Sequence, residues 1–170
     1  VLTSYFYQDT IYLDTSGGTD NGDVVFSLVS DIYGPIHLVD GKRVEEDISV
    51  GLYTLTAIKD GSLNYLDASF SIDISVNPIS QEPFSISNLI DQYDYLRDIY
   101  FDVSGGSSDG DVSFTIPGEF LEGNLLRGGP DVGGYSVTAI KDGSLNYLDA
   151  SATFDFSINK ISQALLEPLS

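Results

Sequence analysis

Two segments of the chain alternate strictly between apolar and polar side chains. In residues 69–76 the apolar positions are Phe70, Ile72, Ile74 and Val76, and Ser or Asp stands between them. Residues 151–158 repeat the pattern, and we expect Ala152, Phe154, Phe156 and Ile158 to face inward. Successive strand residues point to opposite faces, so a period of two predicts strands with one buried face. Alternation at 53–57 and 112–116 predicts two more strands.

Turn signals separate these strands. Asn-Gly and Asp-Gly pairs within 20–23 and 108–111 predict hairpin turns that need positive φ. Lys-Asp-Gly-Ser at 59–62 and 141–144 predicts a further turn. No segment shows sustained helical periodicity. Short strands with a turn about every ten residues predict a β-sandwich of roughly 80 residues.

The chain is one module written twice. The fourteen residues TAIKDGSLNYLDAS occur at 56–69 and again at 138–151, an offset of 82. Upstream, residues 11–24 match residues 99–112 at an offset of 88, so the first copy has six extra residues between Leu28 and Tyr53. A length change between aligned flanks is what a surface loop tolerates.

The repeat predicts an all-β chain of two tandem Ig-like β-sandwich domains, at residues 1–81 and 82–163. Residues 164–170 are expected to be a linker or the start of a next repeat, because Glu-Pro-Leu-Ser at 167–170 echoes Glu-Pro-Phe-Ser at 82–85. Prolines at 78 and 83 predict a short, stiff linker between the copies. A chain that begins with Val is expected to be a mature product or a fragment of a longer array.

A tyrosine opens one strand of each copy. Asp and Gly residues stand just before Tyr53 and Tyr135. Ig-like folds use such a tyrosine as a corner whose hydroxyl bonds back to nearby backbone. Both are therefore predicted to be structural.

The composition narrows the choice of partners. There are 26 acidic and 7 basic residues, a net charge of −19, and no cysteine. Nucleic acid and anionic membranes reward Lys and Arg, so neither is an expected partner. The lack of cysteine excludes a disulfide framework and a thiolate metal site. No apolar run approaches the roughly 18 residues of a membrane helix, so this segment is not expected to insert.

The order of motifs resembles a known family. GG…DGDVSFTI…GGYSVTAIKDGSLNYLDASATFDFSI looks like the MBG-type Ig-like repeats of bacterial surface proteins. The resemblance covers residues 11–77 and 99–159, although the first copy has a single Gly in VGLY and a longer middle segment. It implies tandem modules of extracellular adhesins or surface filaments, and it carries over no catalytic residue.

An enzyme is not expected. His37 is the only histidine and the second copy has none, so a Ser–His–Asp arrangement cannot exist there. In a chain this acidic, paired carboxylates arise by chance. The glycine pairs at 17–18 and 105–106 lack the helix that a phosphate site requires. No cofactor is expected apart from calcium.

Calcium is the one metal that the sequence suggests, since hard cations bind carboxylate oxygens. The candidate ligands are Asp20, Asp23, Asp109 and Asp111. A plain hairpin is the favoured explanation of these turns. An alternative site at the junction would use Glu82, Asp91, Asp94 or Asp98.

The identical loops are candidate ligand sites. The residues that could contact a sugar by hydrogen bonds and stacking are Asn64, Tyr65, Asp67, Asn146, Tyr147 and Asp149. The alternative is that Leu63 and Tyr65 fold back on the core while Asn64 satisfies loop backbone. Some bacterial Ig-like domains form a covalent Lys–Asn bond, for which Lys59 and Asn77, or Lys141 and Asn159, are the residues to consider. Such a bond is not favoured, because it requires a buried cluster, and these lysines lie in a predicted turn while the asparagines face outward by parity.

Three functions remain open at this level. The first is a spacer module of an extracellular stalk, adhesin or surface filament, whose partners are neighbouring repeats. The second is a module for a glycan or protein receptor that uses exposed tyrosines; the tyrosines to test are Tyr5, Tyr7, Tyr12, Tyr33, Tyr93, Tyr95 and Tyr100. The third is homotypic assembly through an edge strand at 84–88.

Overall fold

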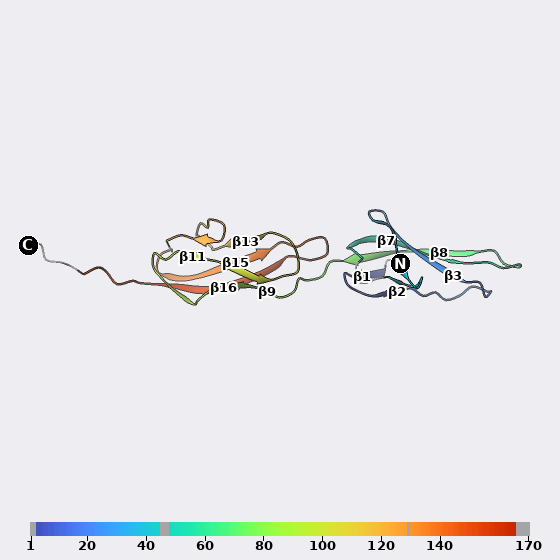
Figure 1. Cartoon of the computed structure of the whole chain (residues 1–170), viewed down its shortest axis with the longest axis horizontal. Helices are drawn as coiled ribbons and strands as arrows, with labels where there is room; N and C mark the ends of the chain where they lie inside the picture. Colours follow the sequence, from blue (N-terminus) through green and yellow to red (C-terminus); the bar gives the residue numbers. More distant parts are fainter. Residues whose placement is uncertain (1–2, 45–47, 129, 166–170) are drawn as a thin grey trace, which may run out of the picture. The chain divides into compact units, whose positions relative to one another are not determined.

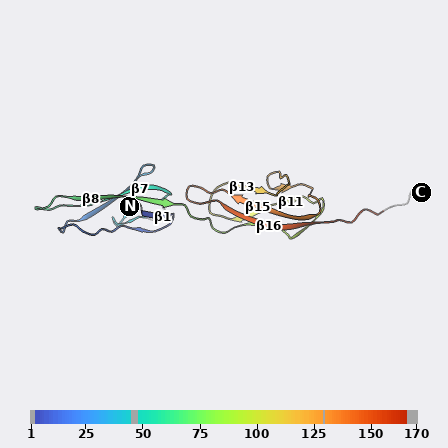
Figure 2. The ribbon, with the colours of Figure 1, turned by 180° about the vertical axis from the view of Figure 1, so that it is seen from behind.

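The computed structural model describes residues 3–44, 48–128 and 130–165. The chain divides into two compact units, Val1–Ile79 and Ser80–Ser170, called unit 1 and unit 2 (Figure 1). All regular elements of the described residues are strands, which confirms the all-β, Ig-like fold class (Figure 2). No described helix is long and apolar enough to cross a membrane. Of the predicted tail 164–170, residues 166–170 lie outside the described residues.

Unit 1 has two sheets. The strands of the larger sheet are β1 (Thr3–Phe6), β3 (Val24–Ser30), β4 (Gly34–Ile36), β7 (Gly51–Lys59) and β8 (Ala68–Asn77). Their order is β1-β8-β7-β3-β4. The smaller sheet, in the order β2-β6-β5, contains β2 (Ile11–Tyr12), β5 (Leu38–Val39) and β6 (Arg43–Val44). The first strand, β1, runs parallel to the last, β8, and the other pairs are antiparallel.

Among its described residues, unit 2 repeats this plan without strands corresponding to β4 and β5 and with one addition at its start. Its main sheet, in the order β10-β16-β15-β13, contains β10 (Gln92–Asp94), β13 (Val112–Thr115), β15 (Gly133–Lys141) and β16 (Ala150–Asn159). A short pair joins β11 (Ile99–Tyr100) to β14 (Leu125–Leu126). The addition is β9 (Phe84–Ser87), which pairs with β12 (Asp102–Gly105) and also contacts β16. The segment predicted as a linker thus belongs largely to unit 2.

The apolar face of the last strand builds each core, as its alternation predicts. Ile74 and Val76 are buried in β8, and Phe156 and Ile158 are buried in β16. The prediction is wrong for Phe70, whose side chain is 65% exposed. The cause is that no described strand of unit 1 covers the beginning of β8.

The two cores differ in character. The buried residues of unit 1 are Ile11, Leu13, Phe26, Leu28, Val44, Tyr53, Ala57, Ile74 and Val76. The core cluster of unit 2 contains Tyr93, Ile99, Phe101, Ile116, Leu126, Val137, Phe156 and Ile158, and Leu125 and Ala139 are buried as well. The Phe156 ring stacks on Tyr135 at 5.8 Å and meets the Tyr93 ring edge-on at 5.7 Å between centroids. Such aromatic pairs add stabilisation beyond the area they bury. The proposal of Tyr93 as an exposed binding residue is therefore wrong.

Both tyrosine corners are confirmed. The Tyr53 hydroxyl donates to the carbonyl of Ser49 at 2.6 Å. The Tyr135 hydroxyl donates to the carbonyl of Asp131 at 2.7 Å. Each bond spans four residues and ties the approach of the strand to the strand itself. Burial raises the pKa of both tyrosines, so each hydroxyl keeps its proton at neutral pH.

The predicted Asn-Gly and Asp-Gly hairpin turns are wrong. The segments before β3 and β13 do not pair with those strands, and neither Gly22 nor Gly110 has a positive φ. Instead, a Cβ at Gly22 would collide with the carbonyl oxygen of Asp60, and one at Gly110 with that of Asp142. Glycine is needed here for close packing of loop against loop and not for a left-handed backbone.

The six extra residues of the first copy lie between β3 and β6. There β3 turns back into β4, with Ser30 paired to Gly34. Ile32 at the tip is exposed. In unit 2 the described residues between β13 and β14 hold a turn and no strand corresponding to β4. The insertion therefore extends an exposed hairpin, as the sequence predicts for a loop.

Candidate functional site

The repeated loop joins β7 to β8 in unit 1 and β15 to β16 in unit 2. Ser62 and Tyr65 exchange backbone hydrogen bonds at 2.9 and 3.3 Å across the loop. Ser144 and Tyr147 do the same at 2.9 and 3.4 Å. A Cβ at Gly61 would collide with the carbonyl oxygen of Tyr65, so the loop closes tightly on glycine.

The two loop aspartates have a structural bond. Asp67 Oδ1 accepts a hydrogen bond from the Gly61 N–H at 2.8 Å. Asp149 Oδ1 accepts the same bond from Gly143 at 2.7 Å. Each carboxylate therefore satisfies backbone at the start of its loop, as turn Asp residues do. One carboxylate oxygen of each candidate ligand-binding aspartate, Asp67 and Asp149, is therefore already engaged in a hydrogen bond within its loop.

The other candidate residues differ in exposure between the units. In unit 1, Asn64 and Tyr65 are exposed, and in unit 2, Asn146 and Tyr147 are half-buried. The expectation that Leu63 folds back on the core is wrong, because its side chain is 99% exposed. Ligand binding by these loops stays a prediction.

A residue that sequence reasoning missed explains much of this difference. The Gln81 side-chain amide donates to the carbonyls of Lys141 and Asp142, both at 3.3 Å, and of Leu148 at 2.9 Å. Its Oε1 accepts from the Ser108 N–H at 3.1 Å. Gln81 thus joins the start of unit 2 to its repeated loop. The signal in the sequence was the recurrence of Gln at 163, the same distance after the last strand.

Some oxygens of the predicted calcium turns are already hydrogen-bonded within the fold. Asp20 Oδ1 accepts from the Gly22 N–H at 2.7 Å. The neighbouring Ser62 hydroxyl and that N–H lower the pKa of Asp20. The backbone carbonyls of Asp23 and Asp111 accept from Asp60 and Asp142. Across residues 3–44, 48–128 and 130–165, no three acidic or His side chains gather as a metal site would require. Calcium binding by Asp20, Asp23, Asp109 or Asp111 stays a prediction.

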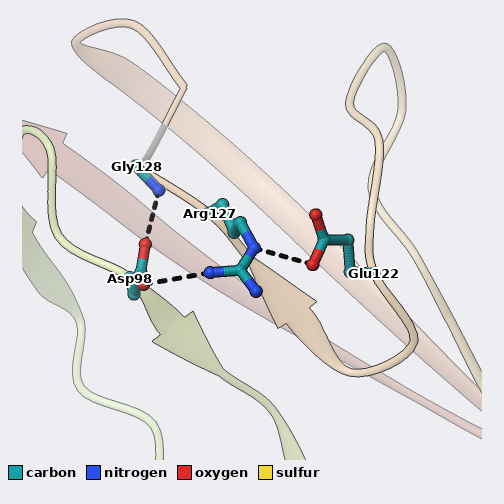
Figure 3. Close-up of polar contacts among 4 residues, drawn as sticks. All are labelled: Asp98, Glu122, Arg127 and Gly128. Atoms are coloured by element: carbon teal, nitrogen blue, oxygen red, sulfur yellow. Dashed lines mark hydrogen bonds and ion pairs between the residues drawn. The ribbon is translucent and has the colours of Figure 1, made fainter.

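One acid of the alternative junction site lies in an ion-pair cluster of unit 2 (Figure 3). Arg127 Nε donates to Glu122 Oε2 at 2.6 Å, and Nη1 lies 3.9 Å from Asp98 Oδ2. Asp98 Oδ1 also accepts from the Gly128 N–H at 2.7 Å. The hydrogen bond to Glu122 raises the pKa of Arg127. The cluster ties the β10–β11 connection to the residues that follow β14.

The covalent alternative for Lys59 and Asn77 is wrong. Lys59 ends β7 opposite Ala68, the first residue of β8, whereas Asn77 is the last residue of β8. The two residues therefore lie at opposite ends of one hairpin. Asn77 instead donates through Nδ2 to Ser4 Oγ at 2.7 Å and to the carbonyl of Tyr5 at 3.0 Å.

Comparison with known proteins finds likeness in structure alone. No family model matches the chain, and no curated protein sequence matches it. The fibronectin(III)-like modules of Clostridium thermocellum CbhA match over 98% of this chain and 95% of theirs, at 11% identity and a TM-score of 0.38. Drosophila N-cadherin EC1-4 matches over 93% of this chain, at 11% identity and a TM-score of 0.37. Bacteroides ovatus SGBP-B, solved with a mixed-linkage heptasaccharide, matches over 92%, at 11% identity and a TM-score of 0.36.

The chain spans less than half of two of these structures, 47% of the N-cadherin structure and 42% of SGBP-B. All three matches are remote in both identity and score. The function is therefore argued from the residues of this chain.

Proposed function

We propose that the two units are structural modules of an extracellular stalk, adhesin or surface filament, where they act as spacers that bear tension. Each unit has a complete core and a tyrosine corner, which a spacer needs. The net charge of −19 keeps neighbouring stalks apart by repulsion. The expected partners in such a stalk are further modules of the same kind.

The observation that carries this proposal is the parallel pairing of the first main-sheet strand with the last. Thr3–Phe6 pairs in register with Ile74–Asn77, and Gln92–Asp94 pairs with Ser157–Asn159. In unit 1 the parallel strands begin and end the unit, and in unit 2 the strand β9 precedes the pair. In both units the chain enters one parallel strand and leaves the other at opposite ends of the pair. Tension along the chain then loads their hydrogen bonds in shear, so that several must break together.

An asparagine at the end of the last strand, Asn77 in unit 1 and Asn159 in unit 2, reinforces the parallel strand pair of each unit. Asn77 binds Ser4 and the Tyr5 carbonyl, and its own carbonyl accepts from the Tyr7 N–H at 2.8 Å. Asn159 donates to Gln92 Oε1 at 3.2 Å. A net contribution of about 1 kcal/mol per hydrogen bond makes this a substantial addition to a short strand pair.

Single-molecule force spectroscopy of the full chain tests the spacer function. We expect two separate unfolding events, one for each unit. Asn77→Ala is expected to lower the force of one event and leave the other unchanged, because forced unfolding follows the barrier to breaking that pair. Asn64→Ala, in the exposed loop, is the matched control. Extension without force peaks would reject the proposal, as would an unchanged force for Asn77→Ala.

A binding module is the second candidate, favoured by the apolar exposure of the unit 1 loop. Leu63, Tyr65 and Leu66 all expose their side chains there. Exposed apolar groups close together mark interaction sites more often than chance. A glycan array is the test, with Tyr65→Ala and Tyr147→Ala as variants. Binding that both variants abolish would favour this function over the spacer.

A further inference from the structure

Unit 2 contains a strand that the described residues of unit 1 lack. In unit 2, β9 pairs with β12 from Phe84↔Gly105 to Ser87↔Asp102. The residues of unit 1 that match β12 at the offset of 88 are 14–17. No described strand pairs with them. Their backbone groups therefore form an open edge, to which a further strand can add.

The strand β9 fills a definite place in unit 2. Its side chains Phe84 and Ile86 are half-buried, and Ile86 packs against the core. A Cβ at Gly105 would collide with the carbonyl oxygen of Pro83, so the approach is too close for any side chain. Gly17 stands at the equivalent position in unit 1 with the same positive φ and open space around it.

The same place in unit 1 is an open groove of about 290 Å³. Its floor is made of the apolar residues Phe26, Leu55, Ala57 and Ile72, and its rim includes Phe70. Two of these, Phe26 and Ala57, belong to the core of the unit. The groove thus exposes an apolar surface that β9 covers in the other copy.

A pocket of about 130 Å³ adjoins the groove, with which it shares Thr15 and Ser16, and a smaller pocket of about 80 Å³ adjoins that one at Gly18. Lys59, Asp60 and Leu66 line the smaller pocket, and they match the three residues whose carbonyls bind Gln81 in unit 2. Asp20, which matches Ser108, lines it as well. Unit 1 therefore presents both the place for a strand and the place for the glutamine that precedes it.

We propose that this groove and these pockets, together the acceptor groove, bind residues 163–170 of a second copy of this chain as an added strand. Copies would then join head to tail, with the C-terminal segment of one chain completing unit 1 of the next. This is strand addition at an open sheet edge, in which main-chain hydrogen bonds give affinity and side-chain pockets give specificity.

The sequence of the C-terminal segment favours this occupant. Asn-Pro-Ile-Ser-Gln at 77–81 precedes β9, the strand that covers the equivalent surface in unit 2. The similar sequence Asn-Lys-Ile-Ser-Gln stands at 159–163, at the end of β16. Gln163 thus leaves the last strand at the same distance as Gln81. A leucine takes the place of Phe84 in either of two alignments. It is Leu166 when residues are counted from the glutamine, and Leu169 when Glu-Pro-Leu-Ser is aligned with Glu-Pro-Phe-Ser. The proposal holds whether or not the units serve as spacers.

Sedimentation of the full chain over a range of concentrations tests the proposal. We expect oligomers that grow with concentration, and more strongly at about 1 M salt, because salt screens the repulsion between acidic chains. A chain that ends at Gln163 should stay monomeric with an unchanged melting curve. Gln163→Ala should raise the dissociation constant about tenfold, as expected from losing two hydrogen bonds. Ser162→Ala, next to it, should leave assembly unchanged.

Amide exchange identifies the surface that is used. Ser16 and Gly18 should exchange slowly in the assembled chain and fast in the truncated one, because their equivalents Ser104 and Gly106 face β9 in unit 2. Thr15 is the internal control, since its N–H already donates to Asp14 Oδ1 at 2.8 Å. A peptide of residues 80–89 should protect the amides of Ser16 and Gly18 and dissolve the oligomers. Residues 81–88 copied ahead of Val1 should fill the groove within the chain and block assembly.

Two outcomes would overturn the proposal. One is a full chain that sediments as a monomer at every concentration and salt while the amides of Ser16 and Gly18 exchange freely. The other is protection of these amides only in the chain that carries the copied segment ahead of Val1. That result would assign the groove to a segment joined within the same chain, and not to a second copy.

Discussion

The same fourteen residues have different surroundings in the two units. Leu63 is 99% exposed in unit 1, and its equivalent Leu145 is 55% exposed in unit 2. Leu66 and Leu148 differ in the same way, at 94% and 50%. Residue identity cannot explain the difference, so it comes from what lies against each loop.

In unit 2 the first residues of the unit contact the loop and a neighbouring segment. Gln81 donates to the Leu148 carbonyl, and the Glu82 N–H donates to Ser107 Oγ at 3.0 Å. The described residues of unit 1 contain no equivalent of either. The residues that lead into a repeat therefore complete the surroundings of its loop. The exposure of a repeated loop depends on these residues as well as on the sequence of the loop itself.

The largest expected effect concerns the tyrosine corner. Tyr53 is 1% exposed, whereas Tyr135 is half-buried, although both make the same bond. Tyr53→Ala should cost unit 1 about 3–5 kcal/mol, the usual loss for a buried aromatic side chain. Tyr135→Ala should cost unit 2 less. Chemical denaturation followed by NMR signals of each unit measures both.

The phenylalanine variants separate the hydroxyl from the ring. Tyr53→Phe and Tyr135→Phe each remove one hydrogen bond and keep the packing, so they should cost nearly equal amounts. Equal losses for the two alanine variants would show that burial does not distinguish the corners.

Gln81→Ala is the next largest change. It removes the bonds to three carbonyls and one N–H of unit 2, which should cost about 1–3 kcal/mol. Exchange of the amides at 143–149 should rise toward that of 61–67, the identical loop in unit 1. The two loops in one sample serve as each other's reference. If the loops keep different exchange rates in Gln81→Ala, another contact causes their difference.

Local patterns predicted the frame of the molecule well. Period-two alternation located β8 and β16, and a short motif located the corners at Tyr53 and Tyr135, because both signals depend on neighbouring residues. The hairpin turns predicted from Asn-Gly and Asp-Gly were wrong because Gly22 and Gly110 are required for another reason. Each packs against a backbone carbonyl of another loop and leaves no room for a side chain. A dipeptide cannot reveal such a contact.

The rest could not be predicted because it depends on contacts between distant residues. The bonds of Gln81 in unit 2 span 60, 61 and 67 positions, and those of Asn77 span more than 70. No period or motif encodes such pairs. The loop aspartates show that contacts within a loop are also hard to predict. The sequence presents Asp67 as a possible ligand-binding residue, but in the structure its carboxylate accepts a hydrogen bond from the Gly61 N–H.

Lowering the pH is expected to reduce the stability of unit 1 through one residue that has no acidic counterpart in unit 2. Asp20 of unit 1 corresponds to Ser108 of unit 2. The pKa of Asp20 lies below its ordinary value of 3.8, because Ser62 and the Gly22 N–H stabilise the carboxylate. Its contribution to stability is therefore present above pH 3.8 and is lost as the pH falls through the lowered value.

Asp20→Ser, which copies the residue of unit 2, measures this contribution. The variant should be less stable than the natural chain at neutral pH, and the two should converge as the pH falls below 3.8. Thermal melts of unit 1 at several pH values follow the difference. All other carboxylates titrate in both chains and cancel. A difference that stays constant across the range would assign the effect of the substitution to packing.

The smallest expected effect is at Arg127, in unit 2. Its ion pairs with Glu122 and Asp98 lie at the surface, where water and salt weaken them. Arg127→Ala should lower the melting temperature of unit 2 slightly at low salt and not at about 1 M salt. Glu122→Gln keeps the side-chain size and should reproduce most of the loss. Asp98→Ala should cost more than Glu122→Ala, because it also removes the acceptor of the Gly128 N–H. The reverse order would mean that the short Arg127–Glu122 bond, and not the backbone contact, holds this part of unit 2.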